Sequence, residues 1–224
     1  MHSFLAAFTS DYYMKALGMN IARITIQQDA KDADIEIRVK SVKESVLFPQ
    51  INNIYSIKYN DKFLPLDYTR IIRQHSVNDQ VSVNYNYNTT QATMYRSSDK
   101  SATQYPILKN MRDVYSFLAK VISGSAGTGV YLIDVNGVCL QAEVIQHSSE
   151  KVKTPMGEYA AIPYEITFHN SKSIKPPYVD MVTHNMLQDN NKLNLWVYNN
   201  QFPVKATFKK KAINCYCDLI SIKQ

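Results

Sequence analysis

Two short patterns in the sequence have the residue types of catalytic or phosphate-binding motifs. Residues 123–129 read SGSAGTG. A phosphate-binding loop needs a strand before it and a helix after it, so that the helix N-terminus faces the anion. Here the order is helix and then strand, which predicts a simple connection. Ser-x-x-Lys occurs at Ser97/Lys100 and at Ser148/Lys151, but in polar, turn-like segments rather than at the start of a buried helix.

The metal-ligating residue types are scattered along the chain. Cys215 and Cys217 lie two apart in a strand-like run, so they face the same way and are poorly placed to form a disulfide. We interpret them, and Cys139, as buried small apolar residues. The acidic residues form no pair suited to acid–base work, and we expect no metal, no cofactor and no enzyme activity. The histidines are equally far apart, at His2, His75, His147, His169 and His184.

The charge of the chain is compatible with an anionic partner. Lys and Arg number 25 against 19 Asp and Glu, and the net charge is +6. The only basic run, residues 209–211, is interpreted as a solvated turn. Because no basic stripe or nucleic-acid module is present, we expect no nucleic-acid partner.

The single tryptophan lies in LNLWVYNNQFPVKATF, residues 193–208. A two-residue turn formed by the two asparagines pairs Trp196 with Pro203 and sets it beside Lys205. Leu195 then belongs to the opposite, core face. A large ring on the mixed face is covered by a helix, by Pro203 or by a ligand, and a longer turn would change these pairings.

Alternation of apolar and polar residues dominates the chain and predicts half-buried antiparallel strands. The Asn136–Gly137 pair between two apolar runs is a strong hairpin signal. Pro163 is expected to interrupt its strand. The predicted strands cover residues 20–27, 33–42, 55–59, 68–73, 81–88, the two arms of 129–146, 158–169, 193–198, 203–208 and 213–221.

One segment has helical spacing instead. Residues 106–123 carry apolar residues three and four apart, with Pro106 suited to the first turn and Gly124 to the exit. Residues 171–180 and 184–192 are predicted loops. The fold class is therefore mainly β (α+β), a curved antiparallel sheet of roughly eleven to thirteen strands with one amphipathic helix against one face.

The order of these features resembles the bacterial exported proteins grouped as domain of unknown function 3108. The resemblance rests on SDYYMKALGMNIARITI, NDKFLPLDYTRII, RDVYSFLAKV, GVYLIDVNG and LWVYNNQFPVKATF, and spans about residues 10–221. Its recurring positions would be Tyr12, Gly18, Ala22, Asp113, Tyr115, Ser116, Trp196, Pro203 and Val204.

The resemblance implies an incomplete barrel with a helix on its concave face, similar to the periplasmic lipoprotein carriers. It also implies export to the periplasm or cell envelope, with no established catalytic residues. Residues 10–224 then form one half-barrel domain, and residues 1–9 are a lead-in or the remnant of a signal peptide. No stretch approaches the roughly 18 apolar residues of a membrane span, so we expect a protein peripheral to the membrane.

Two functions from different classes fit these expectations. The first is non-enzymatic binding of a lipid, a lipoprotein segment or another apolar ligand in the concavity. The second is an envelope adaptor that binds protein or polysaccharide through exposed aromatic and basic residues. The predicted ligand-binding residues are Trp196, Tyr198, Tyr85, Tyr131 and Lys205.

Overall fold

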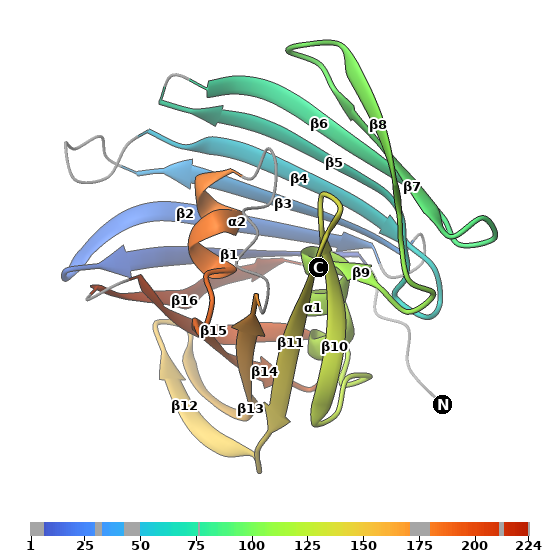
Figure 1. Cartoon of the computed structure of the whole chain (residues 1–224). Coiled ribbons are helices and arrows are strands. Elements are labelled where there is room, and N and C mark those ends of the chain that lie inside the picture. Colours follow the sequence, from blue (N-terminus) through green and yellow to red (C-terminus); the bar gives the residue numbers. More distant parts are fainter. Residues whose placement is uncertain are drawn as a thin grey trace.

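The fold is one large curved sheet with two short helices on its inner side (Figure 1). The computed structural model describes residues 7–29, 33–42, 50–75, 77–170, 180–210 and 213–223. Within them the helices are α1 (Val114–Ile122) and α2 (Met181–Met186). The sixteen strands are β1 (Phe8–Ala16), β2 (Met19–Asp29), β3 (Asp34–Ser41), β4 (Asn52–Tyr59), β5 (Pro65–Gln74), β6 (Val77–Asn86), β7 (Gln91–Arg96), β8 (Ser101–Pro106), β9 (Arg112–Asp113), β10 (Gly129–Val135), β11 (Val138–Gln146), β12 (Glu150–Thr154), β13 (Gly157–His169), β14 (Lys192–Tyr198), β15 (Phe202–Lys210) and β16 (Ile213–Lys223).

The first and last strands of the chain meet in the middle of the sheet. From one edge the order runs from β8 back to β1, continues from β16 back to β13, and ends with β11, β10 and β9. β1 and β16 are antiparallel, with Thr9 opposite Lys223 and Ala16 opposite Cys215. No described strand joins β8 to the β9–β10 edge, so the sheet is an open, incomplete barrel.

The apolar residues of the alternating strands point into the interior, as their pattern predicts. Val81, Val83 and Tyr85 of β6 are buried, whereas the polar residues between them are not. Ile35 and Val39 of β3 are buried in the same way. The predicted fold class, a mainly β curved sheet with a helix on its concave face, is confirmed.

The sheet has more strands than the sequence predicts, because some carry little alternation. β1 lies in the middle of the sheet and is buried along most of its length, so its sequence shows little alternation of apolar and polar residues. It begins at Phe8, inside the predicted lead-in, while residues 1–6 lie outside the described residues. β9 has only two residues, and β8 is largely exposed. The other additional strands are β7 and β12.

The predicted helix exists but starts later. The Asp113 carboxylate accepts hydrogen bonds from the backbone N–H groups two and three residues on, which fixes the start of α1. The expected start at Pro106 is wrong, because Pro106 ends β8 and pairs with Gln91. Gly124, with a φ of +71°, follows the helix as predicted.

α2 corrects the prediction of a loop over residues 184–192. The helix covers Met181–Met186 and is capped by Asp180, whose carboxylate accepts two backbone N–H groups. A helix this short has too few residues to show a helical period in a polar sequence. Of the predicted loop at 171–180, all but Asp180 lies outside the described residues.

β13 runs without a break through Pro163, contrary to the expected interruption. On one side β13 pairs with β12 as far as Ala161 and with β11 from Tyr164 onward. Pro163 lies at the change of partner, where its missing N–H costs no ladder hydrogen bond.

Tyrosine side chains bridge the open side of the barrel. The Asp134 carboxylate on β10 accepts hydrogen bonds of 2.8 Å from the hydroxyls of Tyr85 on β6 and Tyr105 on β8. Its other oxygen accepts the backbone N–H of Gly137. The opening between β8 and β10 is thus linked by side chains rather than by a backbone ladder.

Candidate functional site

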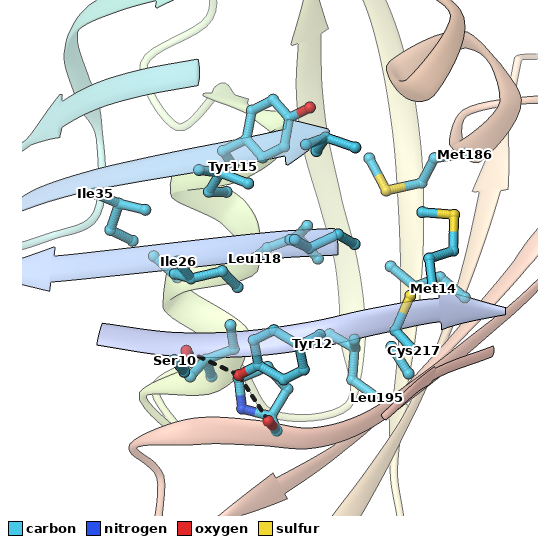
Figure 2. A pocket seen from close by; sticks show the side chains of 18 of the residues that line it. Ser10, Tyr12, Met14, Ile26, Ile35, Tyr115, Leu118, Met186, Leu195 and Cys217 are labelled. Carbon is cyan, nitrogen blue, oxygen red and sulfur yellow. Dashed lines mark hydrogen bonds between the residues drawn. The ribbon is translucent and has the colours of Figure 1, made fainter. Parts of the chain in front are cut away.

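An apolar cavity of about 160 Å³ lies between the middle of the sheet and the two helices (Figure 2). Its walls come from β1, β2 and β3 at the start of the chain and from β14, β15 and β16 at its end. α1 and α2 form the remaining side. The cavity therefore exists only where the two ends of the chain are paired.

Strand alternation aims the wall residues inward. Ser10, Tyr12 and Met14 are every second residue of β1, and all three line the cavity. Ile24 and Ile26 of β2 do the same, on the face that the sequence groups as one side of residues 20–27.

The few polar groups of the cavity are bonded within the protein. The Tyr12 hydroxyl lies 2.9 Å from the backbone oxygen of Pro203 and 3.0 Å from Ser10 Oγ (Figure 2). Burial raises the pKa of Tyr12, so the phenol stays neutral. Apart from Gln28 and the hydroxyl of Tyr115, the lining that remains is hydrocarbon and sulfur.

The helices close the cavity with aliphatic side chains. Leu118 and Ile122 of α1 face it, as do Val182 and Met186 of α2. This matches the expectation of an amphipathic helix packed against the concave face.

A buried polar network fixes α2 to the sheet and to α1. The Asp180 carboxylate accepts hydrogen bonds from the Tyr55 hydroxyl at 2.7 Å, from Thr183 Oγ1 at 2.7 Å and from Arg70 Nη1 at 3.4 Å. The hydroxyl of Tyr115, which lines the cavity, lies 3.1 Å from Thr183 Oγ1. Arg70 and Asp180 are each 1% exposed, so this ion pair is fully desolvated.

One end of the cavity is lined by sulfur. Met14, Met186 and Cys217 come from β1, α2 and β16 and converge there (Figure 2). Burial raises the pKa of Cys217 to about 12, so it is a neutral thiol rather than a nucleophile. Methionine is flexible and polarizable, and it adapts to guests of different shape.

The other end of the cavity adjoins a polar hollow. Phe8 and Gln28 belong to the lining of both. Burial raises the pKa of Asp34 in this hollow. The remaining charged groups of the hollow are Asp29, Glu36 and Lys223.

Trp196 and Lys205 lie together, but outside the cavity. Trp196 pairs with Lys205 and not with the predicted Pro203, because the turn is longer than two residues and a bulge follows Trp196. The Lys205 ammonium lies 5.6 Å from the centre of the Trp196 ring, and the indole N–H donates to Glu150. Leu195 lines the cavity, so the adjacent Trp196 faces the opposite side of the sheet.

The three predicted tyrosines are also outside the cavity and apart from one another. Tyr198 packs against the rings of Tyr159 and Phe202. Tyr85 is buried, and its hydroxyl donates a hydrogen bond to the Asp134 carboxylate. Tyr131 donates to the backbone oxygen of Gly127 and packs on Phe117. Hydrogen bonding and ring packing account for these tyrosines, and their binding of a ligand stays a prediction.

Many of the residues that line the cavity are aliphatic residues on the apolar side of alternating strands. Ile35, Ile37 and Val39 are an example from β3. Their alternation predicts an inward face, but nothing in it separates a filled interior from a hollow one.

The motif-like segments have structural roles. Residues 123–129 connect α1 to β10. The hydroxyl of Ser97 donates to Asp79, which Arg96 also contacts. Cys215 and Cys217 are buried as predicted, whereas Cys139 is exposed, so the prediction that it is buried is wrong. In the described part of the chain, no three His, Cys, Asp or Glu side chains are grouped as metal ligands. No described helix is long and apolar enough to span a bilayer.

Of three similar solved structures, the first shows the same fold. A β-barrel-like protein of domain of unknown function DUF1849 from Brucella abortus superposes with a TM-score of 0.65 and 8% identity over 98% of each chain. A protein described as exported, with a YmcC-like fold, from Bacteroides fragilis gives 0.34 and 10% identity over 98% of this chain and 97% of that one. A protein described as a lipoprotein, from Parabacteroides distasonis, gives the same values with 96% of its chain covered.

Comparison by sequence identifies the family. No curated protein matches, whereas the family model for a protein of unknown function, DUF3108, matches residues 7–211. The resemblance read from the order of the sequence features is confirmed. The chain belongs to the DUF3108 family.

Proposed function

We propose that this protein is a non-enzymatic binding protein of the cell envelope that holds the hydrocarbon part of a lipid, or the acyl chain of a lipoprotein, in the cavity beneath α1 and α2. The observation that carries the proposal is the chemistry of the cavity wall. Its aliphatic and sulfur groups face the space, while the hydroxyls of Ser10 and Tyr12 are bonded inside the protein.

The size of the cavity limits what it holds. A cavity of about 160 Å³ is close to the engineered apolar cavities of about 150 Å³ that bind benzene, and smaller than the roughly 300 Å³ or more of drug-sized sites. It therefore accommodates a short run of methylene groups. A longer chain extends out past Phe8 and Gln28 into the adjoining polar hollow.

The adaptor function, binding of an envelope protein or glycan through exposed aromatic and basic residues, requires no cavity. A filled interior would have favoured it. The open space between the sheet and the helices favours a ligand that is bound inside. Envelope localisation belongs to the same proposal, and fractionation of cells after mild osmotic shock tests it.

Isothermal titration with single-chain phospholipids tests the proposal. Acyl chains from hexanoyl to tetradecanoyl are titrated below their micelle-forming concentrations. Each buried methylene contributes about 0.8 kcal/mol, or about fourfold in Kd. We expect affinity to rise at about this rate and then level off once the chain outgrows the cavity.

A matched pair of variants locates the binding. Ala206 lines the cavity, and Thr207 is the next residue of β15, facing the other side. Ala206→Phe fills the cavity, and we expect it to weaken binding at least tenfold, whereas Thr207→Phe leaves binding unchanged. Affinity that does not depend on chain length, or equal effects of the two variants in folded protein, would overturn the proposal.

A further inference from the structure

The turn between β1 and β2 holds a residue that does not suit its backbone. Ala16 and Met19 pair across the turn, and the two residues between them, Leu17 and Gly18, have φ values of +51° and +75°. Two positive φ values in a two-residue hairpin are those of a type I′ turn, whose first position favours asparagine, aspartate or glycine. Leucine is disfavoured there because its Cβ crowds the following carbonyl oxygen.

Two other tight turns of this chain have asparagine at positions of positive φ. The β10–β11 turn has Asn136 and Gly137 at +54° and +88°. The β14–β15 turn has Asn199 and Asn200 at +49° and +54°. Positive φ also occurs at His75, Thr90 and Lys100, which are polar, so Leu17 differs from these residues in being apolar.

A leucine at this position also gains nothing from burial. Phe63 has a positive φ of +58° as well, but its ring stacks on Tyr59 with ring centres 5.3 Å apart. The Leu17 side chain is 59% exposed. An apolar residue that is both poorly accommodated and exposed points to a role outside the fold.

Leu17 belongs to a small apolar tip at this end of the sheet. Met19 and Val42 are each 50% exposed. Val42 lies beside the start of β2, because its N–H donates to the backbone oxygen of Ile21. We call Leu17, Met19 and Val42 the apolar tip.

The strands around the apolar tip carry lysine. β15 ends beside the β1–β2 turn, and β16 begins there, at the left of Figure 1. Lys15, Lys40 and Lys209 lie at this end, and Lys40 and Lys209 are exposed. Lys15 contacts Asp218 at 3.1 Å. The three residues nearest this end in each of β1, β2, β3, β15 and β16 include no carboxylate.

We propose that the apolar tip inserts into the surface of an anionic lipid bilayer while the exposed Lys40 and Lys209 face lipid phosphates. Three exposed side chains at one end of the sheet are too few for a stable protein interface, which buries about 800 Å² per partner. A few apolar side chains combined with basic charge are sufficient for reversible binding at a membrane surface. This docking site is separate from the cavity and does not depend on its ligand.

Vesicle co-sedimentation of the whole chain tests the proposal. We expect binding to vesicles of phosphatidylglycerol and phosphatidylethanolamine, little binding to phosphatidylcholine alone, and weaker binding in high salt because the charges are screened. Leu17→Asn reproduces the Asn–Gly sequence of the β10–β11 turn. It should reduce vesicle binding at least tenfold while leaving the Tm unchanged or higher.

A second leucine provides the matched control. Leu108 is 52% exposed and lies between β8 and β9, away from the apolar tip, so Leu108→Asn should leave vesicle binding unchanged. Equal binding by Leu17→Asn and the unchanged protein would overturn the proposal, as would no vesicle binding at all. So would light scattering in which Leu17→Asn abolishes self-association instead. Phospholipid titrations of Leu17→Asn in solution keep this result separate from the cavity, since they should be unaltered.

Discussion

Asp113 and Asp11 are both almost fully buried, yet their carboxyl groups ionise at very different pH. Burial raises the pKa of Asp113 from 3.8 to about 6, and the hydrogen bonds at the start of α1 only partly oppose it. Burial would also raise the pKa of Asp11, but hydrogen bonds from Arg23, Thr25 and Ser221 outweigh it and lower the pKa to about 2. Asp11 has a cationic partner in Arg23, whereas Asp113 lies deeper and has none among the described residues, and together these differences give the two shifts opposite signs.

Asp113→Asn is expected to change how stability depends on pH. Because the pKa is raised in the folded protein, the Asp113 contribution is fully present below pH 3.8 and is lost as pH rises to about 6. At about 1.4 kcal/mol per pKa unit, it amounts to about 3 kcal/mol. Asparagine keeps the helix cap but does not ionise. Urea unfolding between pH 4 and 7 should therefore show this decline in the unchanged protein and not in the variant.

Asp11→Asn serves as the control for that experiment. The lowered pKa of Asp11 gives stability that is present above pH 3.8 and is lost as pH falls toward 2. The two variants should thus differ from the unchanged protein in separate pH ranges. If the free energies of unfolding of Asp113→Asn and the unchanged protein change in parallel from pH 4 to 7, the pKa of Asp113 is not raised in the folded protein.

At the scale of elements, α2 depends on the buried polar network around Asp180, which includes one ion pair. A helix of six residues does not form by itself, and Asp180 supplies both its cap and its bond to Arg70. The Nε and Nη2 atoms of Arg70 have no hydrogen-bond partner among the described residues. Arg70 therefore depends on Asp180 for its charge balance.

Replacing both members of this pair should cost less stability than the sum of the two single replacements. Asp180→Ala leaves the Arg70 charge buried and unpaired, which costs about 3–5 kcal/mol. Arg70→Met leaves Asp180 with its hydrogen bonds from Tyr55 and Thr183. We expect the double variant to be more stable than the sum of the single effects by about 0.5–3 kcal/mol, measured as free energies of urea unfolding. Strict additivity would show that the two groups are not coupled.

Turn geometry limits what the sequence predicts about elements. The Asn136–Gly137 hairpin is found as expected, because its residues fit one turn type. The asparagines at 199 and 200 also take positive φ, but the strands close from Tyr198 to Phe202 and a bulge shifts the register. Both turn lengths leave aliphatic residues on one face, so the sequence pattern does not distinguish them.

At the scale of the whole molecule, the middle and the edges of the sheet differ in protection. β1 and β16 are paired on both sides, whereas β8 forms an edge and is mostly exposed. Amide hydrogen exchange should be slowest in β1 and β16 and fastest in β8. Mass spectrometry of peptides from these strands measures it, and equal protection of β8 would mean that the open side is closed in solution.

The sequence predicts the strands and their inward faces better than it predicts their arrangement. The alternation of apolar and polar residues in β3 is enough to predict that Ile35 and Val39 are buried. That this face lines a cavity depends on the pairing of β1 with β16 and on Asp180 holding α2 nearby. Both are contacts between residues far apart in the chain, which local spacing does not encode.

The pairing of β1 with β16 sets the order of events during synthesis. Tyr12 and the backbone oxygen of Pro203, which bond across the cavity, are 191 residues apart. At a translation rate of about 5–20 residues per second, Pro203 of β15 is synthesised roughly 10–40 s after Tyr12 of β1. A nascent chain thus has no complete site, and its apolar strands remain uncovered until the last ones emerge. Ligand capture is therefore an event of the finished chain.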